Sequence, residues 1–167
     1  MNQIAQFIGT PFAVATAPKT LQWLVKFAEA RTTTTYLSLS KQIGIHHRVL
    51  PHVLGQIGFS LQRLSPNIPP IQLLVVNQKT KIPGTLGLGF IIADKQVLDS
   101  LSLPNRRILW EVAREKVFNW NWREVLKQFG LAPLSTPVPP LHEIEAQIEA
   151  AFSRGGGEQE DHRRLKE

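Results

Sequence analysis

Apolar residues recur every three or four positions through three successive segments of the first half of the chain, and a threonine run and then Gly44 separate these segments. Such spacing places the apolar side chains on one face of an α-helix. It predicts an amphipathic helix over residues 19–30, just after Pro18, then a helix of two turns after a threonine run, and a third helix that starts near His47. We therefore expect a mainly helical protein.

The second and third helices are separated by Gly44, a residue typical of helix C-caps. In the third helix Arg48, His52 and Gln56 lie four positions apart, on a different face from the apolar residues. Two helices joined by a tight turn, the second presenting Arg, His and Gln, predict a helix-turn-helix.

A proline-rich break at 65–70 follows, and then a short apolar run at 71–76 that predicts a buried strand. Residues 77–80 are typical of a hairpin turn, and the glycine-spaced segment 81–90 is typical of the wing of a winged helix. The expected fold is thus mainly α with a small β-hairpin: a winged helix-turn-helix followed by C-terminal helices.

The second half of the chain predicts three further helices. The first starts near Asp94, and the last is short and ends at Gly130. The middle one is expected to turn an apolar side inward and a charged side outward; the apolar side consists of Ile108, Leu109, Val112 and Phe118, and the charged side of Arg107, Glu111, Arg114 and Glu115. Trp110, Trp120 and Trp122 are expected in the core or an interface.

These patterns divide the chain into four parts. We expect a winged-helix DNA-binding domain over 1–92, a helical extension over 93–131, a proline-rich linker over 132–140 and a charged helical tail over 141–167. The tail is similar to the opening helix of restriction-type nuclease domains, although an ordinary charged terminal helix has the same composition.

Positive charge is concentrated in the first part. Residues 1–92 hold eight Lys or Arg and the single acid Glu29, whereas the remainder holds 11 Lys or Arg and 12 acids. A polyanion partner, double-stranded DNA, is one interpretation, and a merely solubilising charge is the other. The expected DNA-contacting residues are Arg31, Thr33, Thr34, Thr35, Tyr36, Lys41, His46, His47, Arg48, His52, Gln56, Lys79 and Lys81.

Several classes of function are disfavoured. The chain has no cysteine, which excludes disulfides, thiolate nucleophiles and cysteine-containing zinc sites. His46 and His47 have no carboxylate near them in sequence, so we expect neither a metal site nor a cofactor. No apolar stretch approaches the length of a membrane span, which predicts a cytoplasmic protein without a membrane partner.

Four motifs resemble, in order, the DNA-binding domain of DNA alkyltransferases and alkyltransferase-like proteins. Residues 31–36 (RTTTTY) resemble the family's threonine-rich start of the first helix, and Arg48-Val-Leu resembles the start of its recognition helix. Asn67-Ile-Pro-Pro is similar to the family's Asn-Pro-x-Pro hinge, and residues 83–89 (PGTLGLG) to its glycine-rich loop.

The resemblance implies roles for individual residues. Tyr36 would push on a phosphate during base flipping, and Arg48 would fill the space of the flipped base. Base-pocket candidates are Asn67, Val75, Gly84 and Gly87. Val75 stands where the family has its alkyl-accepting cysteine, so no transferase activity and no catalytic residue are expected.

Each motif also has a structural interpretation. The threonines can cap a helix, since capping requires the same hydroxyls as phosphate contact. Tyr36 can pack in the core with its hydroxyl at the rim, and the glycine-rich run can be simple turn geometry.

The leading hypothesis is a non-catalytic DNA-binding module that recognises a modified or flipped base and targets a restriction or repair nuclease, as a linked domain or a separate subunit. One alternative is a winged-helix transcriptional regulator that forms a homodimer. Another is an interaction subunit of a defence or repair complex.

Overall fold

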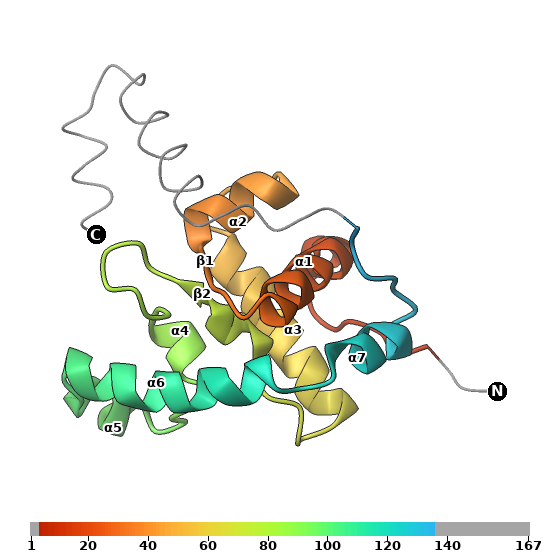
Figure 1. Cartoon of the computed structure of the whole chain (residues 1–167). Helices are drawn as coiled ribbons and strands as arrows, with labels where there is room; N and C mark the ends of the chain where they lie inside the picture. The colour runs from red at the N-terminus through yellow and green to blue at the C-terminus, as the bar shows by residue number, and fades with distance from the viewer. Residues whose placement is uncertain (1–3, 136–167) are drawn as a thin grey trace, which may run out of the picture.

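A computed structural model of the chain describes residues 4–135, which are mainly helical with a small two-stranded sheet (Figure 1). The predicted tail and most of the linker lie outside these residues. The elements are α1 (Pro11–Glu29), β1 (Thr34–Thr35), α2 (Tyr36–Ile43), α3 (Leu50–Leu64), the 3-10 helix η1 (Ile71–Leu74), β2 (Val75–Val76), α4 (Thr85–Leu88), α5 (Lys95–Ser100), α6 (Leu103–Phe118) and α7 (Trp122–Gln128).

Helix α1 lies at the centre and contacts α2, α3, α6, α7 and η1. The prediction that it starts after Pro18 was wrong, because the helix begins at Pro11. Thr10 provides the stronger start signal: its hydroxyl accepts a hydrogen bond from the Ala13 amide at 3.3 Å. Pro18 therefore stands inside the helix, where it contributes no backbone N–H.

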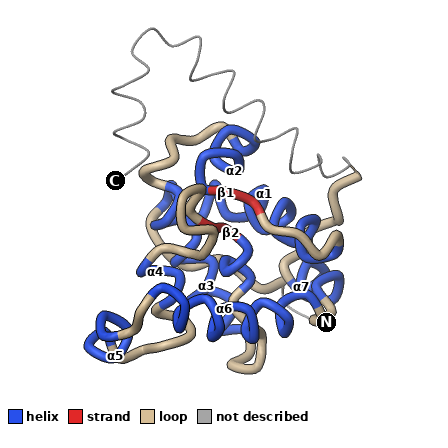
Figure 2. Tube along the Cα trace, turned by 60° about the vertical axis from the view of Figure 1, so that its left-hand side comes forward, coloured by secondary structure: helices blue, strands red, loops and turns tan. Residues whose placement is uncertain are grey.

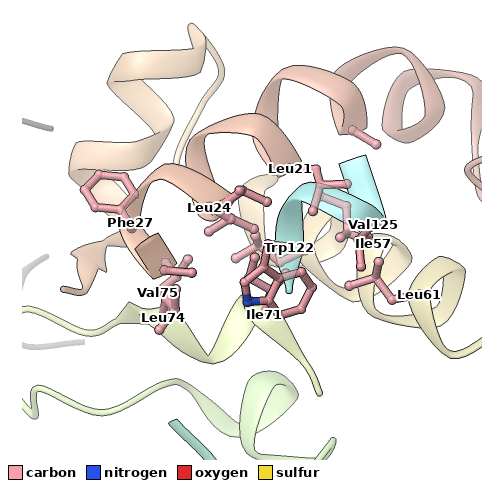
Figure 3. Packing of buried hydrophobic residues seen from close by; sticks show 14 of the residues in the cluster. Leu21, Leu24, Phe27, Ile57, Leu61, Ile71, Leu74, Val75, Trp122 and Val125 are labelled. Atoms are coloured by element: carbon pink, nitrogen blue, oxygen red, sulfur yellow. The ribbon is translucent and has the colours of Figure 1, made fainter. Parts of the chain in front are cut away.

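The main core forms where α1, α3, η1 and α7 meet (Figure 3). As the apolar spacing predicted, α1 buries Leu21 and Leu24, and α3 buries Ile57. Trp122 and Val125 of α7 belong to the same cluster. Residues from both halves of the chain therefore share one core.

The expected β-hairpin is replaced by a parallel pair in which Thr34 aligns with Val75 and Thr35 with Val76. Figure 2 shows the two strands side by side. Helices α2 and α3 provide the long crossover that parallel strands require. The segment after β2 closes on itself, since the Asn77 amide donates to the Ile82 carbonyl at 2.9 Å, and the predicted wing contains the short helix α4.

The two-helix unit predicted around Gly44 forms with a shifted boundary. Gly44 adopts a left-handed backbone conformation, φ 79°, and its amide donates to the Ser40 carbonyl at 2.8 Å. Helix α3 begins at Leu50 instead of near His47, with Pro51 in its first turn. Arg48 consequently lies in the turn before α3.

The orientation of α6 differs from the prediction. Ile108 and Val112 are exposed, whereas Trp110 and Val117 are buried. The indole of Trp110 donates a hydrogen bond to the Leu73 carbonyl at 2.8 Å, which fixes the inward side of the helix. Arg114, expected outside, lies over the Trp110 ring at 4.8 Å.

Within residues 4–135, none of the helices is both long enough and apolar enough to cross a lipid bilayer.

Candidate nucleic-acid interface

Exposed basic residues occur on three neighbouring segments of the first half of the chain. Lys41 is in the last turn of α2, and His46, His47 and Arg48 form the turn before α3. Lys79 and Lys81 are in the loop after β2, which in Figure 1 projects on the side of the β1–β2 pair away from α7. Among the described residues, the Arg48 guanidinium makes neither an ion pair nor a hydrogen bond.

The imidazole rings of His46 and His47 stack, with their centroids 4.5 Å apart. His46 Nδ1 accepts a hydrogen bond from the Arg48 amide at 3.1 Å, which fixes the turn. Desolvation lowers the pKa of His47 below its ordinary value, and the positive charge of His46 and Arg48 adds to that effect. A phosphate near this turn would oppose the lowering, since it favours the protonated imidazole.

The face of α3 that was predicted to contact DNA is partly occupied by the N-terminal segment. The His52 Nε2 lies 3.4 Å from the Thr10 hydroxyl, and the Gln56 side chain packs against Gly9. The Ile8 amide also donates to the Ser60 hydroxyl at 2.9 Å. We therefore remove Gln56 from the candidate interface and keep its exposed neighbours at the N-terminal end of α3.

Two threonines of the run at 32–35 that were predicted to contact phosphate are buried instead. Thr34 and Thr35 are 1% and 5% exposed. The Thr35 hydroxyl caps α2 by accepting a hydrogen bond from the Ser38 amide at 3.1 Å. Capping is thus the role that the structure gives to Thr35, while Thr33 stays partly accessible.

The side chain of Arg31 is bound to α6 and to the residue that follows it. Its guanidinium pairs with Glu115 at 2.7 Å, donates to the Asn119 side chain at 3.0 Å and lies over the Phe118 ring. A phosphate would have to compete with these contacts, so Arg31 is a weaker DNA-contacting candidate than Arg48.

Tyr36 joins the start of α2 to the segment before α4. Its hydroxyl accepts a hydrogen bond from the Gly84 amide at 3.0 Å. Burial raises the pKa of the Tyr36 phenol above its ordinary value, and the hydrogen bond from Gly84 opposes the rise. The phenol therefore stays protonated at neutral pH and keeps a hydrogen to donate.

A small pocket opens beside Tyr36, between α3, η1 and α4, and encloses about 20 Å³. Of the four predicted pocket residues, Gly87 lines it and Gly84 holds Tyr36 at its edge. Asn67 is exposed in the turn after α3, and Val75 is buried in the main core. Neither of these two residues lines this pocket.

Gln72 is the pocket residue that sequence reasoning missed. It is 2% exposed, and within the part of the chain that the structure describes neither its amide nitrogen nor its amide oxygen has a hydrogen-bond partner. One signal was present: glutamine interrupts the otherwise apolar run at 71–76.

In residues 4–135, no group of three or more His, Asp or Glu side chains is arranged to hold a metal ion. Comparisons of the chain with protein-family models, curated proteins and solved structures find no match. The similarity to alkyltransferase-like proteins accordingly stays a prediction.

Proposed function

We propose that the chain is a non-catalytic DNA-binding protein that contacts double-stranded DNA through the end of α2, the turn at 46–48 and the loop after β2. This surface has the composition that phosphate binding requires, because exposed Lys and Arg release counterions when they neutralise phosphates. The observation that carries the proposal is Arg48, a cation without an internal partner among the described residues, placed in the turn between α2 and α3. A helix-turn-helix would present a cation at this position to the DNA.

The resemblance to alkyltransferase-like proteins extends this proposal. If the segment after β2 and α4 act as a wing, the domain is a winged helix-turn-helix, and Arg48 and Tyr36 have the order along the chain expected of residues that open a duplex. With valine at position 75 the protein would read a modified or flipped base without altering it. Such a reader would serve to direct a restriction or repair nuclease.

The proposal is tested by replacing Arg48 with alanine. We expect duplex DNA to bind at least about tenfold more weakly and the salt dependence of binding to fall by about one phosphate contact. The matched control is Arg63→Ala, because Arg63 is an exposed arginine in the last turn of α3, remote from the turn at 46–48. Fluorescence anisotropy with a labelled duplex measures both variants. Equal affinity losses in the two variants would show that net charge, not this surface, attracts the DNA.

Binding is also expected to depend on pH through His47. Since its pKa is lowered in the free protein, DNA binding should be accompanied by proton uptake, and affinity should rise as the pH falls from about 7.5 to about 5.5 at constant ionic strength. The stability of the free protein has the opposite trend, because below a pH of about 6.5 the unfolded chain takes up more protons than the folded one. In His47→Gln both trends should become weaker; unchanged pH profiles would contradict the role of His47.

A second function is favoured by α6. Its residues Ile108, Leu109 and Val112 are 60%, 40% and 58% exposed and share one face of the helix. Exposed apolar patches mark interaction sites, so this face supports the alternative of a homodimeric regulator that presents two α3 helices. Light scattering tests the homodimeric regulator against the DNA-binding module proposed first. The regulator is expected to be a dimer that Val112→Glu converts to a monomer, and a monomeric wild-type protein contradicts it.

A further inference from the structure

The N-terminal segment at 4–10 runs along the face of α3 that was predicted to contact DNA. Its last three residues each contact one member of a stripe on α3 whose residues are four positions apart. The contacting pairs are Thr10 with His52, Gly9 with Gln56 and Ile8 with Ser60. We call residues 4–10 the strap, because they cross α3 on the way from the end of α7 to the start of α1.

Both ends of the strap are fixed to elements other than α3. At one end the Ala5 amide donates to the Gln128 carbonyl at 2.7 Å, and the Phe7 ring stacks on the Phe129 ring with the centroids 4.3 Å apart. At the other end Thr10 caps α1. The part that covers α3 lies between these anchors, so it can leave α3 while the strap stays attached to α1 and α7.

Gly9 fits against Gln56 in a way that glycine alone allows. Its backbone has φ 128°, a conformation that other residues rarely adopt, and a Cβ at this position would lie 2.5 Å from the side-chain oxygen of Gln56. The strap has no charged residue. It therefore covers polar groups of α3 without forming an ion pair with the basic residues of the proposed DNA-binding surface.

We propose that the strap is autoinhibitory, and that it must leave α3 before double-stranded DNA can contact His52 and Gln56. In a helix-turn-helix the residues near the start of the second helix reach the bases, and these two side chains belong to the first two turns of α3. The strap and the DNA thus compete for one face. Gln56 is outside the interface while the strap is closed and joins it when the strap opens.

This inference rests on the proposed DNA-binding function and adds its regulation. A protein that binds DNA fully only in its open form has an apparent affinity reduced by the fraction of molecules that are open. Any change that weakens the contacts between the strap and α3 should raise that fraction. The affinity for DNA should then increase even though the folded protein has lost an interaction.

The test weakens the strap with Gly9→Ala, in which the new methyl group must displace the Gln56 side chain and alanine disfavours the observed φ. We expect the variant to bind duplex DNA about two- to tenfold more tightly than the wild-type protein, the factor that corresponds to the loss of one hydrogen bond. Its Tm should fall, because the strap contacts also stabilise the fold. Fluorescence anisotropy and calorimetry measure the two quantities.

The matched control is Gly58→Ala, the same substitution on a side of α3 that packs against Gln72 and Phe90 instead of the strap. It should lower Tm and leave the DNA affinity unchanged, which separates a loss of stability from release of the strap. A second variant, Ser60→Ala, removes the hydroxyl that accepts the hydrogen bond from Ile8. It should also raise the affinity, without a strained backbone at position 9.

Hydrogen exchange of the Ile8 amide reports the position of the strap directly. This amide is hydrogen-bonded to Ser60 in the free protein. When the wild-type protein is saturated with duplex DNA, its exchange should become faster, because the strap has left α3.

The outcomes separate the two levels of the proposal. If neither the wild-type protein nor Gly9→Ala binds duplex DNA, the DNA-binding function is wrong and the autoinhibitory role is wrong with it. If the two proteins bind equally, if Gly9→Ala binds more weakly, or if exchange of the Ile8 amide slows in the complex, DNA binding stands and the autoinhibitory role of the strap is overturned.

Discussion

Replacing Trp122 with alanine is expected to lower the free energy of unfolding by about 3–5 kcal/mol, the usual cost of removing a buried tryptophan. Trp122 is 2% exposed, lies in the main core between α1 and η1, and donates a hydrogen bond from its indole to the Val117 carbonyl at 2.6 Å. The variant loses all of these contacts and leaves a cavity. Denaturant unfolding followed by circular dichroism measures the change.

Trp120→Ala is the matched control for this experiment. Trp120 is two positions away but 37% exposed, so its removal should cost much less, about 1 kcal/mol. Similar losses for the two tryptophans would contradict the shared core. So would an unfolding curve with two transitions, since the structure joins α7 and α1 in one hydrophobic cluster.

Two glycines of α3 should respond in opposite directions to the same substitution. Gly58→Ala is expected to destabilise the protein by about 1–3 kcal/mol, because the new methyl group must displace the Phe90 ring and the Gln72 amide. Gly55→Ala is expected to stabilise it by about 0.5–1 kcal/mol, since a Cβ at Gly55 meets no described atom within 4 Å and alanine is the better helix former. Thermal or denaturant unfolding of both variants gives the comparison.

This pair of variants tests the packing behind the pocket directly. If both alanines stabilise the protein, Phe90 and Gln72 do not pack tightly against α3, and the pocket does not have the shape described above. If both alanines destabilise the protein, the space around Gly55 is not open, and Gly55 and Gly58 do not differ in packing as described.

The elements that could be predicted from the sequence are those whose signals are local. Helix α2 ends at Gly44, Asp94 caps α5, and α7 is followed by Gly130 in a left-handed conformation. In each case the capping residue and the apolar spacing lie within a few positions of one another, so no distant contact is needed to interpret them.

The features that the sequence did not reveal depend on distant contacts. Pairing of β2 with Thr34 and Thr35 is decided by the crossover through α2 and α3, not by the turn-like residues after β2. The inward side of α6 is decided by Trp110, whose hydrogen-bond partner is 37 positions away. A three-to-four residue spacing alone could not distinguish that side from the exposed one.

The candidate site was predictable in part for the same reason. Arg48, Lys41 and the histidine turn were identified from charge and from their place in a two-helix unit, and the structure leaves them exposed. The commitment of Arg31 to Glu115, and the burial of Thr34, depend on α6 and β2, which are remote in sequence. That the Gln72 amide is buried without a hydrogen-bond partner among the described residues became visible only when its surroundings were known.

The salt dependence of duplex DNA affinity tests the central claim most directly. With the wild-type protein, a plot of the logarithm of the association constant against the logarithm of the salt concentration should be linear with a negative slope. The magnitude of this slope should be about 0.9 for each phosphate contact, and we expect several such contacts. Binding that is absent at low salt, or an affinity that does not change with salt, would contradict a DNA-binding function for this protein.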